Sequence, residues 1–448
     1  MLGKADASPV NTPRILERSE HNVSRKELSE NALKVLYRLN KGGFEAYLVG
    51  GGVRDILLGE HPKDFDIATN ATPEQVKKLF RNSRIIGRRF RLVHIVFGRD
   101  IIEVATFRGH HATADEKKAT AHSKQSEHGM LLRDNIYGSI EEDAERRDFT
   151  INALYYSVKD FRVYDFANGL EDIKRRQIRL IGDPETRYRE DPVRMLRAIR
   201  FATKLDMKIE KSTAEPITQL ASLLENIPPA RMFEEYLKLF MAGKAEANFD
   251  VLQQNKLLVY LFPHISQIVA QSPDAQAVQF VRLVLKNTDK RINEGLRVTP
   301  AFLLSAVLWY NIEAMKQQLV SKEALPIQDA FFAALNEVMA EQQRRIAIPK
   351  RFQLPMKDIF VLQHRLIRRD GNRALKLLEH PKFRAAYDFL LLRGQVEGGE
   401  TEELANWWTH FQSANYETQQ QMIKSLKGPR TGRRRIQRKR PKPRSKES

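Results

Sequence analysis

The apolar pattern of this chain changes once, near Asp160, and this change restricts the folds that the chain can adopt. Before it, runs of β-branched and aromatic residues at Leu92–Phe97 and Ile101–Phe107 predict strands, while Lys26–Asn40 has helical spacing. After it, nearly every apolar stretch has helical spacing. We therefore predict an α+β protein in which a mixed-sheet head precedes helical domains. The expected helices include Val193–Leu205, Arg231–Met241, Ala275–Leu285, Pro300–Tyr310, Leu325–Gln343 and Arg373–Leu378.

The length of 448 residues favours about three folded domains. We predict a head over residues 25–160, a helical neck over residues 161–228 and a helical body over residues 229–422. The polar residues 1–24 are expected to form a flexible N-terminus. Residues 423–448 are expected to form a disordered basic tail, because they contain almost no apolar side chains to bury.

Positive charge gathers in that tail. The chain has 75 Lys and Arg against 56 Asp and Glu, a net charge of +19, and the segment from Lys424 to Ser448 holds twelve of these cations with Glu447 as its single acid. Such a balance predicts a polyanionic partner, most simply nucleic acid bound through its phosphates. A tail that only keeps the protein in solution is the alternative.

Several classes of site are excluded by composition. The sequence has no cysteine, which rules out disulfides, Cys-ligated zinc, iron–sulfur clusters and cysteine nucleophiles. Its longest apolar stretches, such as Ala301–Tyr310, fall short of the roughly 20 residues that a membrane helix needs. The first ten residues lack the apolar core of a secretory signal. We therefore expect a cytoplasmic protein without a membrane segment.

A glycine run follows the strand predicted over Phe44–Val49. Gly50, Gly51 and Gly52 lie between this strand and a short helix expected over Val53–Leu58. Glycines at this junction let the backbone approach a ligand closely, and the helix N-terminus presents free N–H groups to phosphate. Arg54 adds a cation. A plain tight turn is the alternative interpretation of the same residues.

Two aspartates follow the glycine run. Asp64 and Asp66 are two residues apart, so in an extended segment both carboxylates point to the same face. They can then bind the same hard divalent cation, and a metal pair held in this way supports in-line phosphoryl transfer. An isolated pair of this kind is commonly two surface aspartates. The glycine run upstream and the basic chain favour the catalytic interpretation here.

Four segments carry a resemblance to a known family. They are LVGGGVRDILLGEHPKDFDIAT from Leu48 to Thr69, EEDAERRDFTINALYY from Glu141 to Tyr156, DFANGLED from Asp165 to Asp172, and ETRYREDPVRMLRAIRFATKL from Glu185 to Leu205. In order and spacing they resemble the class II nucleotidyltransferases of the polymerase-beta superfamily, which include CCA-adding enzymes and bacterial poly(A) polymerases. The motifs cover about a third of the chain, from Tyr47 to Leu205.

The resemblance implies roles for individual residues. Asp64 and Asp66 would bind two Mg²⁺ ions, or Mn²⁺, and Asp148 would be a further catalytic acid. Glu103 competes with Asp148 for the place of the third carboxylate at the metals; a half-buried strand acid paired with arginine is its alternative role. The nucleotide contacts that the resemblance implies are Gly51, Gly52, Arg54, Arg147, Asp191, Arg194 and Arg197.

The segment after Glu190 has the signals of a capped helix. Asp191 stands where an N-cap belongs and Pro192 at the first helical position, with arginines on one stripe of the helix that follows. An ordinary amphipathic helix would look the same. The resemblance implies that Asp191 and Arg194 read the Watson–Crick edge of the incoming nucleotide in place of a template.

Further features favour one branch of the family. IIGRRFRLVHIVFG, from Ile85 to Gly98, resembles the segment that distinguishes bacterial poly(A) polymerases, as do the long N-terminal extension and the basic C-terminus. This implies an enzyme that adds AMP from ATP to RNA 3′ ends. It would act as a monomer in RNA polyadenylation and decay, with RNA-decay proteins as partners. A CCA-adding tRNA nucleotidyltransferase and a noncatalytic RNA-binding protein are the alternatives.

Two groups of residues are expected to have structural roles and no part in a binding or catalytic site. The polar segment Gly109–Gly129 contains four histidines whose spacing fits no metal-site pattern, so we expect a solvated loop there. The aromatic residues Tyr310, Trp407 and Trp408 are expected in a core rather than on a surface that stacks RNA bases. The four histidines are His110, His111, His122 and His128.

Overall fold

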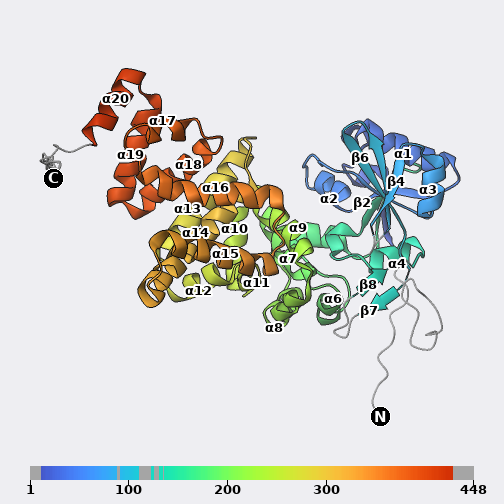
Figure 1. Ribbon diagram of the computed structural model, residues 1–448. Coiled ribbons are helices and arrows are strands. Elements are labelled where there is room, and N and C mark those ends of the chain that lie inside the picture. The colour runs from blue at the N-terminus through green and yellow to red at the C-terminus, as the bar shows by residue number, and fades with distance from the viewer. Residues whose placement is uncertain (1–11, 88–90, 110–122, 126–130, 135, 427–448) are drawn as a thin grey trace, which may run out of the picture. The chain divides into compact units, whose positions relative to one another are not determined.

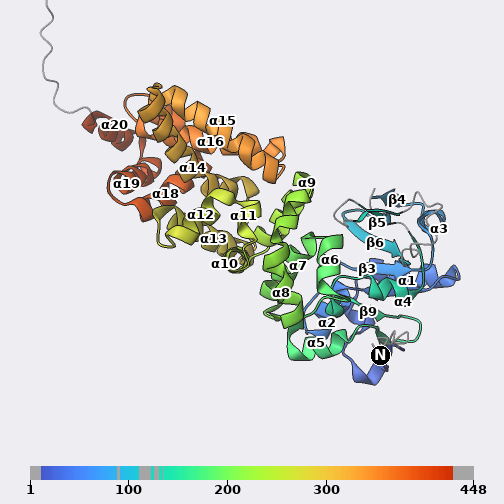
Figure 2. The same ribbon diagram turned by 90° about the horizontal axis from the view of Figure 1, so that it is seen from below.

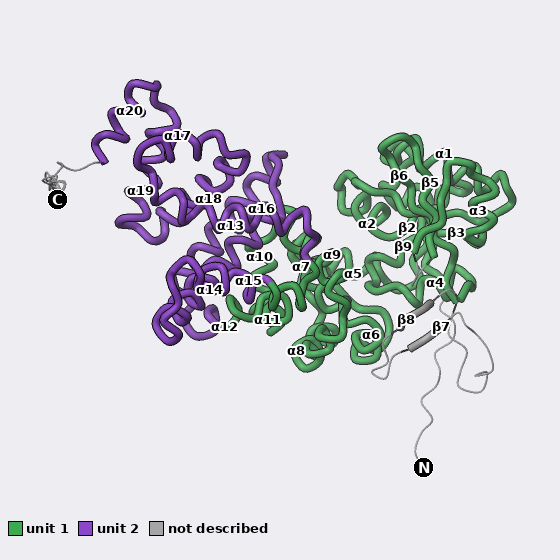
Figure 3. The backbone as a smooth tube through the Cα atoms, in the orientation of Figure 1, with its two compact units in different colours: residues 1–267, 340–347 green, residues 268–339, 348–448 purple. Residues whose placement is uncertain are grey.

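The computed structural model describes residues 12–87, 91–109, 123–125, 131–134 and 136–426. The expected loop histidines, most of the basic tail, and Arg88, Arg89 and Phe90 of the segment Ile85–Gly98 lie outside these residues. The chain divides into two compact units (Figure 3). Unit 1 comprises residues 1–267 with 340–347, and unit 2 comprises residues 268–339 with 348–448.

Unit 1 is built around a mixed sheet. Among the described residues, eight strands join in the order β1-β10-β9-β2-β3-β6-β5-β4. β3 and β6 run parallel, and the other neighbours in this sheet run antiparallel. The strands are β1 (Arg14–Leu16), β2 (Ala46–Val49), β3 (Asp66–Thr69), β4 (Ser83–Ile86), β5 (Leu92–Phe97), β6 (Asp100–Thr106), β9 (Leu154–Tyr156) and β10 (Val163–Asp165). The predicted α+β class with a mixed-sheet head is confirmed.

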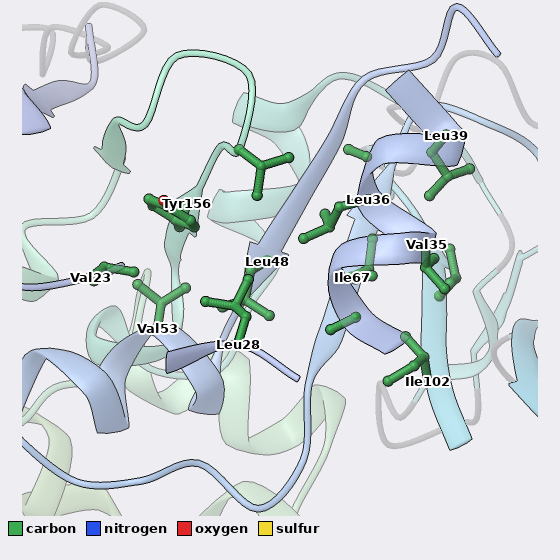
Figure 4. Close-up of a cluster of buried hydrophobic side chains, with 14 of the residues drawn as sticks. Val23, Leu28, Val35, Leu36, Leu39, Leu48, Val53, Ile67, Ile102 and Tyr156 are labelled. Carbon is green, nitrogen blue, oxygen red and sulfur yellow. The ribbon is translucent and has the colours of Figure 1, made fainter. Parts of the chain in front are cut away.

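One face of the sheet packs against α1 (Glu30–Lys41), whose N-terminus is capped by the Ser29 side chain. Figure 4 shows Leu48, Ile67 and Ile102 of the sheet gathered with Val35 and other apolar residues of α1. Since side chains alternate along a strand, the residues next to these in sequence face the other side of the sheet. Asp66 of β3 and Glu103 of β6 therefore lie on the face opposite α1.

The short helices of the head have local signals that explain their bounds. α3 (Pro73–Leu79) begins with a capping box between Thr72 and Gln75, with Pro73 at its first position, as the sequence predicted. α4 (Ile140–Glu145) begins with a similar box at Ser139. The remaining head helix is α2 (Gly51–Leu57).

The N-terminal residues differ from the expectation of a flexible segment. Arg14–Leu16 form β1, which pairs with β10, and Val23 is fully buried in the core. The Asn22 amide donates a hydrogen bond of 2.7 Å to the Ile56 carbonyl. The prediction of flexibility over residues 1–24 is therefore wrong for residues 14–23, because apolar residues too few to show a period still complete the sheet and its core. The sheet also extends past residue 160, the predicted end of the head, to β10.

Helices follow the sheet within unit 1 (Figures 1 and 2). Two further pairs of short strands are β7 (Ser123–Gln125) with β8 (Leu131–Asp134), and β11 (Gln177–Ile178) with β12 (Lys208–Ile209). The helices are α5 (Gly169–Arg175), α6 (Pro184–Glu190), α7 (Val193–Leu205), α8 (Lys211–Leu220), α9 (Pro229–Phe240), α10 (Ala245–Gln254) and α11 (Leu258–Leu261), with α12 (Pro263–Gln271) at the boundary with unit 2.

The described part of unit 2 is helical. Its helices are α13 (Gln276–Asn293), α14 (Pro300–Glu323), α15 (Ile327–Arg345, which ends in unit 1), α16 (Lys350–Ile367), α17 (Arg373–Leu378), α18 (Phe383–Glu397), α19 (Gly399–Ser413) and α20 (Tyr416–Ser425). Trp408 is fully buried and donates a hydrogen bond of 3.0 Å to the Leu366 carbonyl. The core role predicted for Trp408 is confirmed, whereas Trp407 is half-buried and stacks on Phe411. No helix in the described part of the chain is long and apolar enough to cross a membrane.

Candidate active site

The glycine run forms a single turn followed at once by a helix. Gly50 has a φ of 72°, in the region that favours glycine, and α2 begins at the next residue. Gly51 and Gly52 therefore lie in the first turn of α2, whereas the sequence predicted a helix that begins at Val53. A Cβ at Gly52 would lie 3.5 Å from the Leu48 side chain and 3.6 Å from the Asp64 carbonyl oxygen, so this turn packs closely on β2 and on the segment before β3.

Three carboxylates gather where β3 begins. Asp66 is the first residue of β3; it pairs with Val49 of β2 on one side and with Glu103 of β6 on the other. Residues paired in this way point to the same face, so the carboxylates of Asp66 and Glu103 are neighbours. Asp64 lies two residues before Asp66, and both aspartates are exposed. The strand order thus brings Glu103 beside the pair that the sequence singled out.

The electrostatics of Asp66 fit a cation site. The Asp66 side chain is exposed to solvent, but the protein around it removes part of the hydration of its carboxylate. This desolvation raises the pKa of Asp66 to about 6. The carboxylates of Glu103 and Asp64 add to this increase in pKa, while Arg147 opposes it. A divalent cation prefers oxygen ligands and would offset the mutual repulsion. Among the described residues, no group of three or more His, Asp or Glu side chains is already arranged so that it could hold a metal ion.

Asp148 lies in a different environment. Its Oδ2 accepts a hydrogen bond of 2.7 Å from Arg197 Nε and a second one from Arg197 Nη2, while its Oδ1 accepts from the Phe149 backbone and from Asn152. Although burial opposes ionisation, these partners hold the pKa of Asp148 well below its usual range. The structure thus brings Asp148 and Arg197 together as an ion pair and places Glu103 beside Asp66.

Arg147 faces the glycine turn. Its Nε donates to the Tyr155 hydroxyl at 2.8 Å, and its Nη2 donates to Asp143 at 3.0 Å. Tyr155 in turn donates to the same carboxylate oxygen of Asp143 at 2.7 Å. The third nitrogen, Nη1, lies 3.7 Å from the position of a Cβ at Gly50. Two fixed partners therefore hold the Arg147 guanidinium with one edge toward the turn.

Arg54 already makes several contacts within the protein, which the sequence did not indicate. Its guanidinium is buried and lies 5.1 Å from the centre of the Phe201 ring of α7. It donates to Asp55 at 2.8 and 2.5 Å and to the Asn152 side chain at 2.6 Å. Arg54 Nη2 also lies 3.4 Å from the position of a Cβ at Gly51. Arg54 therefore links α2 to Asn152 and α7 beneath the glycine turn.

The predicted base-reading residues lie at the start of α7. Pro192 is the cap residue of this helix, so the prediction that Asp191 is its N-cap is wrong. The Asp191 carboxylate instead accepts a hydrogen bond of 2.7 Å from Arg231 of α9. Arg194 Nη1 donates to the Arg187 carbonyl at 2.6 Å and to Glu190 at 3.0 Å. Both side chains are thus held in place by neighbours.

Sequence reasoning missed the residues that hold this site together. Arg231 lies 40 positions after Asp191, and nothing in the local pattern connects the two. Asn152 had a signal, because it belongs to the RRDFTIN segment that carries the family resemblance. It accepts from Arg54 and donates to Asp148, so it joins the two ion pairs of the site.

Comparison with known families identifies three matching regions. The family described as "Poly A polymerase head domain" matches residues 46–179, which hold most of the sheet and all three clustered carboxylates. "Probable RNA and SrmB- binding site of polymerase A" matches residues 206–268. "Polymerase A arginine-rich C-terminus" matches residues 323–445.

Solved structures share the fold at low identity. The Bacillus stearothermophilus CCA-adding enzyme in complex with CTP has a TM-score of 0.54 at 24% identity, covering 88% of this chain and 82% of that one. A tRNA-processing enzyme with CTP has a TM-score of 0.55 at 23% identity, covering 88% of this chain and 97% of that one. These similarities show a common fold.

Curated relatives are closer in sequence. The CCA-adding enzyme of Lactobacillus helveticus is 32% identical over 64% of this chain and 69% of its own length. The Poly(A) polymerase I of Haemophilus influenzae is 48% identical over 91% of this chain and 90% of its own length. That of Salmonella typhimurium is 56% identical over 92% of this chain and 88% of its own length. By this identity, and by the head-domain match over the residues that include Asp64 and Asp66, the chain belongs to the poly(A) polymerase I family.

Proposed function

We propose that this chain is a template-independent poly(A) polymerase that transfers AMP from ATP to the 3′ end of RNA. The RNA 3′ oxygen forms a bond to the α-phosphorus of ATP, the bond between that phosphorus and the bridging oxygen breaks, and pyrophosphate leaves. The observation that carries the proposal is the meeting of Asp64, Asp66 and Glu103 beside a glycine turn, in a chain 56% identical to a Poly(A) polymerase I.

The acidic cluster is the proposed site of Mg²⁺, with Mn²⁺ as a substitute. Asp64, Asp66 and Glu103 supply the carboxylate oxygens that such hard cations prefer. When bound, a metal pair of this kind stabilises the charge on the attacking and leaving oxygens. We propose Glu103 as the third carboxylate, since it neighbours Asp66 on the adjacent strand whereas Asp148 is paired with Arg197.

The triphosphate is proposed to lie at the glycine turn. The first N–H groups of Gly51 and Gly52 and the edge of Arg147 that faces Gly50 are donors suited to phosphate oxygens. Arg54 acts beneath the turn, by fixing α2 to Asn152, rather than by direct phosphate contact.

The adenine base is proposed to be read at the start of α7. Asp191 offers an acceptor and Arg194 a donor, as the family resemblance implies. Arg231 and Glu190 hold these two side chains, which suits a site that recognises a single base. Arg197 contributes through Asp148, because this ion pair ties α7 to the segment that precedes Asn152.

The remaining parts of the function are proposals at a larger scale. We propose that the helical neck and body hold single-stranded RNA, and that the protein acts as a cytoplasmic monomer in RNA polyadenylation, alongside RNA-decay proteins. The family match over residues 206–268, described as a probable RNA and SrmB- binding site, supports an RNA-binding role for a region beyond the head.

The catalytic assignment is tested with carboxylate variants. We expect Asp64→Ala and Asp66→Ala to abolish AMP addition while RNA affinity, measured by fluorescence anisotropy, stays within about twofold. Glu60→Ala, which removes an exposed acid from the same connecting segment, is the matched control and should remain active. Full activity in either aspartate variant would reject the metal-site assignment.

The choice of third carboxylate has its own test. Glu103→Gln is expected to weaken Mn²⁺ binding to the free enzyme, measured by electron paramagnetic resonance. Asp148→Asn is expected to leave that binding unchanged, because Asp148 faces Arg197. The reverse pattern would assign the place at the metals to Asp148.

A further inference from the structure

One histidine lies next to the acidic cluster and has no part in the function proposed above. His94 belongs to β5, where its partner in the antiparallel register is Glu103 of β6. Glu103 is also the register partner of Asp66 on β3. The three residues thus form a row across three neighbouring strands, in the order Asp66, Glu103, His94. At the spacing of sheet strands, each is about 5 Å from the next.

The row lies on the face of the sheet opposite α1. Val93 and Ile95, on either side of His94, are buried in the core, as are Ile102 and Val104 on either side of Glu103. Figure 4 shows Ile67 and Ile102 on the side of the sheet that packs against α1. The alternation of strand side chains therefore turns His94 and Glu103 away from α1, toward the face that carries Asp66.

His94 contacts Glu103 directly. The Nε2 atom of His94 lies 3.4 Å from Oε2 of Glu103, with 23% of the histidine side chain and 40% of the glutamate side chain exposed. A glutamate with this much exposure has several rotamers open to it, and a fixed neighbour restricts them. The core residues Val93 and Ile95 on either side fix the backbone of His94, so the histidine can act as that neighbour.

We propose that His94 is a positioning residue for the metal site. It donates an Nε2–H hydrogen bond to Oε2 of Glu103 and leaves the other carboxylate oxygen for the divalent cation that Asp66 also binds. Outer partners of this kind orient metal-binding carboxylates. The inference rests on the proposed role of Glu103.

The sequence context of His94 agrees with this role. His94 lies in the segment Ile85–Gly98, which resembles the bacterial poly(A) polymerases. The pairing of His94 with Glu103 therefore connects this segment to the row of Asp66, Glu103 and His94. Beyond His94, its register partner on β4 is Arg84, which is exposed and serves as a neighbouring control position.

The proposal is tested by two substitutions at one position. His94→Leu removes the donor, and we expect Mn²⁺ affinity of the enzyme without ATP or RNA to fall about tenfold. The kcat for AMP addition should fall with it, while KM for ATP stays within about twofold. His94→Gln keeps a donor at nearly the same reach and should restore most of the Mn²⁺ affinity. Arg84→Ala should bind Mn²⁺ as the unmodified protein does.

Other outcomes would overturn the proposal. Unchanged Mn²⁺ affinity in His94→Leu, or equal losses in the leucine and glutamine variants, would show that no donated hydrogen bond is involved. Should the leucine variant fail to fold, His94→Asn, whose amide is too short to reach Glu103, replaces it in the comparison. Glu103→Gln separates this proposal from the one on which it rests. Weakened Mn²⁺ binding in that variant, together with normal binding in His94→Leu, rejects His94 alone, whereas normal binding in Glu103→Gln rejects both.

Discussion

Asp66 and Asp148 show how neighbours decide what an aspartate can do. Desolvation and two nearby carboxylates raise the pKa of Asp66 to about 6, which favours a carboxyl that binds a proton or a cation. Asp148 is more enclosed, yet Arg197 and the donors around it lower its pKa. The family resemblance assigned catalysis to both residues; their surroundings favour a metal role for the first and a structural ion pair for the second.

The Asp148 ion pair makes a prediction about stability and pH. Because its pKa in the folded protein is below the ordinary value of 3.8, the stabilisation is complete above about pH 4 and is lost as the pH falls further. We expect Asp148→Asn to lower the free energy of unfolding by about 2 kcal/mol at pH 7. In urea titrations at pH 7, 4 and 3, this difference should shrink below pH 4. A difference of the same size at every pH would contradict the ion-pair role.

For single residues, the sequence best predicts sites whose residues lie close together along the chain. Asp64, Asp66 and the glycines lie within one short segment, so their spacing, together with the basic chain, indicated a shared site. The partners Arg231 for Asp191 and Arg197 for Asp148 come from 40 and 49 positions away, and only the fold brings them together. For the same reason, the sequence alone left Glu103 and Asp148 as alternatives, and the strand order is what places Glu103 beside Asp66.

The range of α7 was predicted, although its cap residue is Pro192 and not Asp191. Its apolar stripe over Val193–Leu205 and the proline before it mark a helix whose interior is buried in unit 1. α2 was predicted to begin two residues late, because glycines usually indicate a turn, whereas here Gly51 and Gly52 lie in the first helical turn. β1 was missed because three residues are too few to show a period.

The residues of the segment DFANGLED, from Asp165 to Asp172, form and stabilise the start of α5. The Asp165 carboxylate accepts hydrogen bonds from the backbone N–H groups of Ala167, Gly169 and Leu170, which satisfies the free donors at this helix start. Gly169 packs so closely that a Cβ there would lie 2.3 Å from the Thr150 carbonyl oxygen. The motif thus fixes α5 against the residues that follow Asp148.

This packing predicts the effect of a single methyl group. Gly169→Ala should lower the free energy of unfolding by about 3 kcal/mol, because the Thr150 backbone must move to admit it. The control is Gly43→Ala, where φ is +83° and a Cβ would meet nothing within 4 Å. That variant carries only backbone strain and should cost about 1 kcal/mol. Chemical denaturation measures both values, and equal losses would show that the contact with Thr150 is unimportant.

For the whole molecule, the change of apolar period near Asp160 correctly predicted a mixed-sheet head and a helical remainder. The predicted limits of the head, residues 25 and 160, are too narrow. The sheet includes β1 before the first limit and β10 after the second. Sequence patterns mark individual elements but not which elements pack together. The predicted start of the tail at residue 423 is wrong, because α20 continues to Ser425 and Ile423 is buried. The neck and body boundaries remain predictions.

The basic C-terminus is predicted to act through charge alone. Deleting residues 428–448 removes ten Lys and Arg, so RNA affinity should fall. The slope of log affinity against log salt should also become shallower, by about 0.7 for each phosphate that the tail neutralises in the full chain. Binding measured by fluorescence anisotropy between about 50 and 200 mM salt covers the useful range. An unaltered slope after the deletion would show that the tail does not contact the RNA.

Nucleotide preference tests the central claim most directly, since CCA-adding enzymes share the fold and part of the sequence. The purified full chain is incubated with Mg²⁺ and each nucleoside triphosphate in turn, using an RNA unrelated to tRNA and a tRNA that lacks its 3′ end. The length of the extended RNA is measured on a gel. We predict long tails from ATP on both RNAs and no efficient addition from CTP. Efficient CTP addition confined to the tRNA, followed by a stop after a few nucleotides, would contradict the assignment as a poly(A) polymerase.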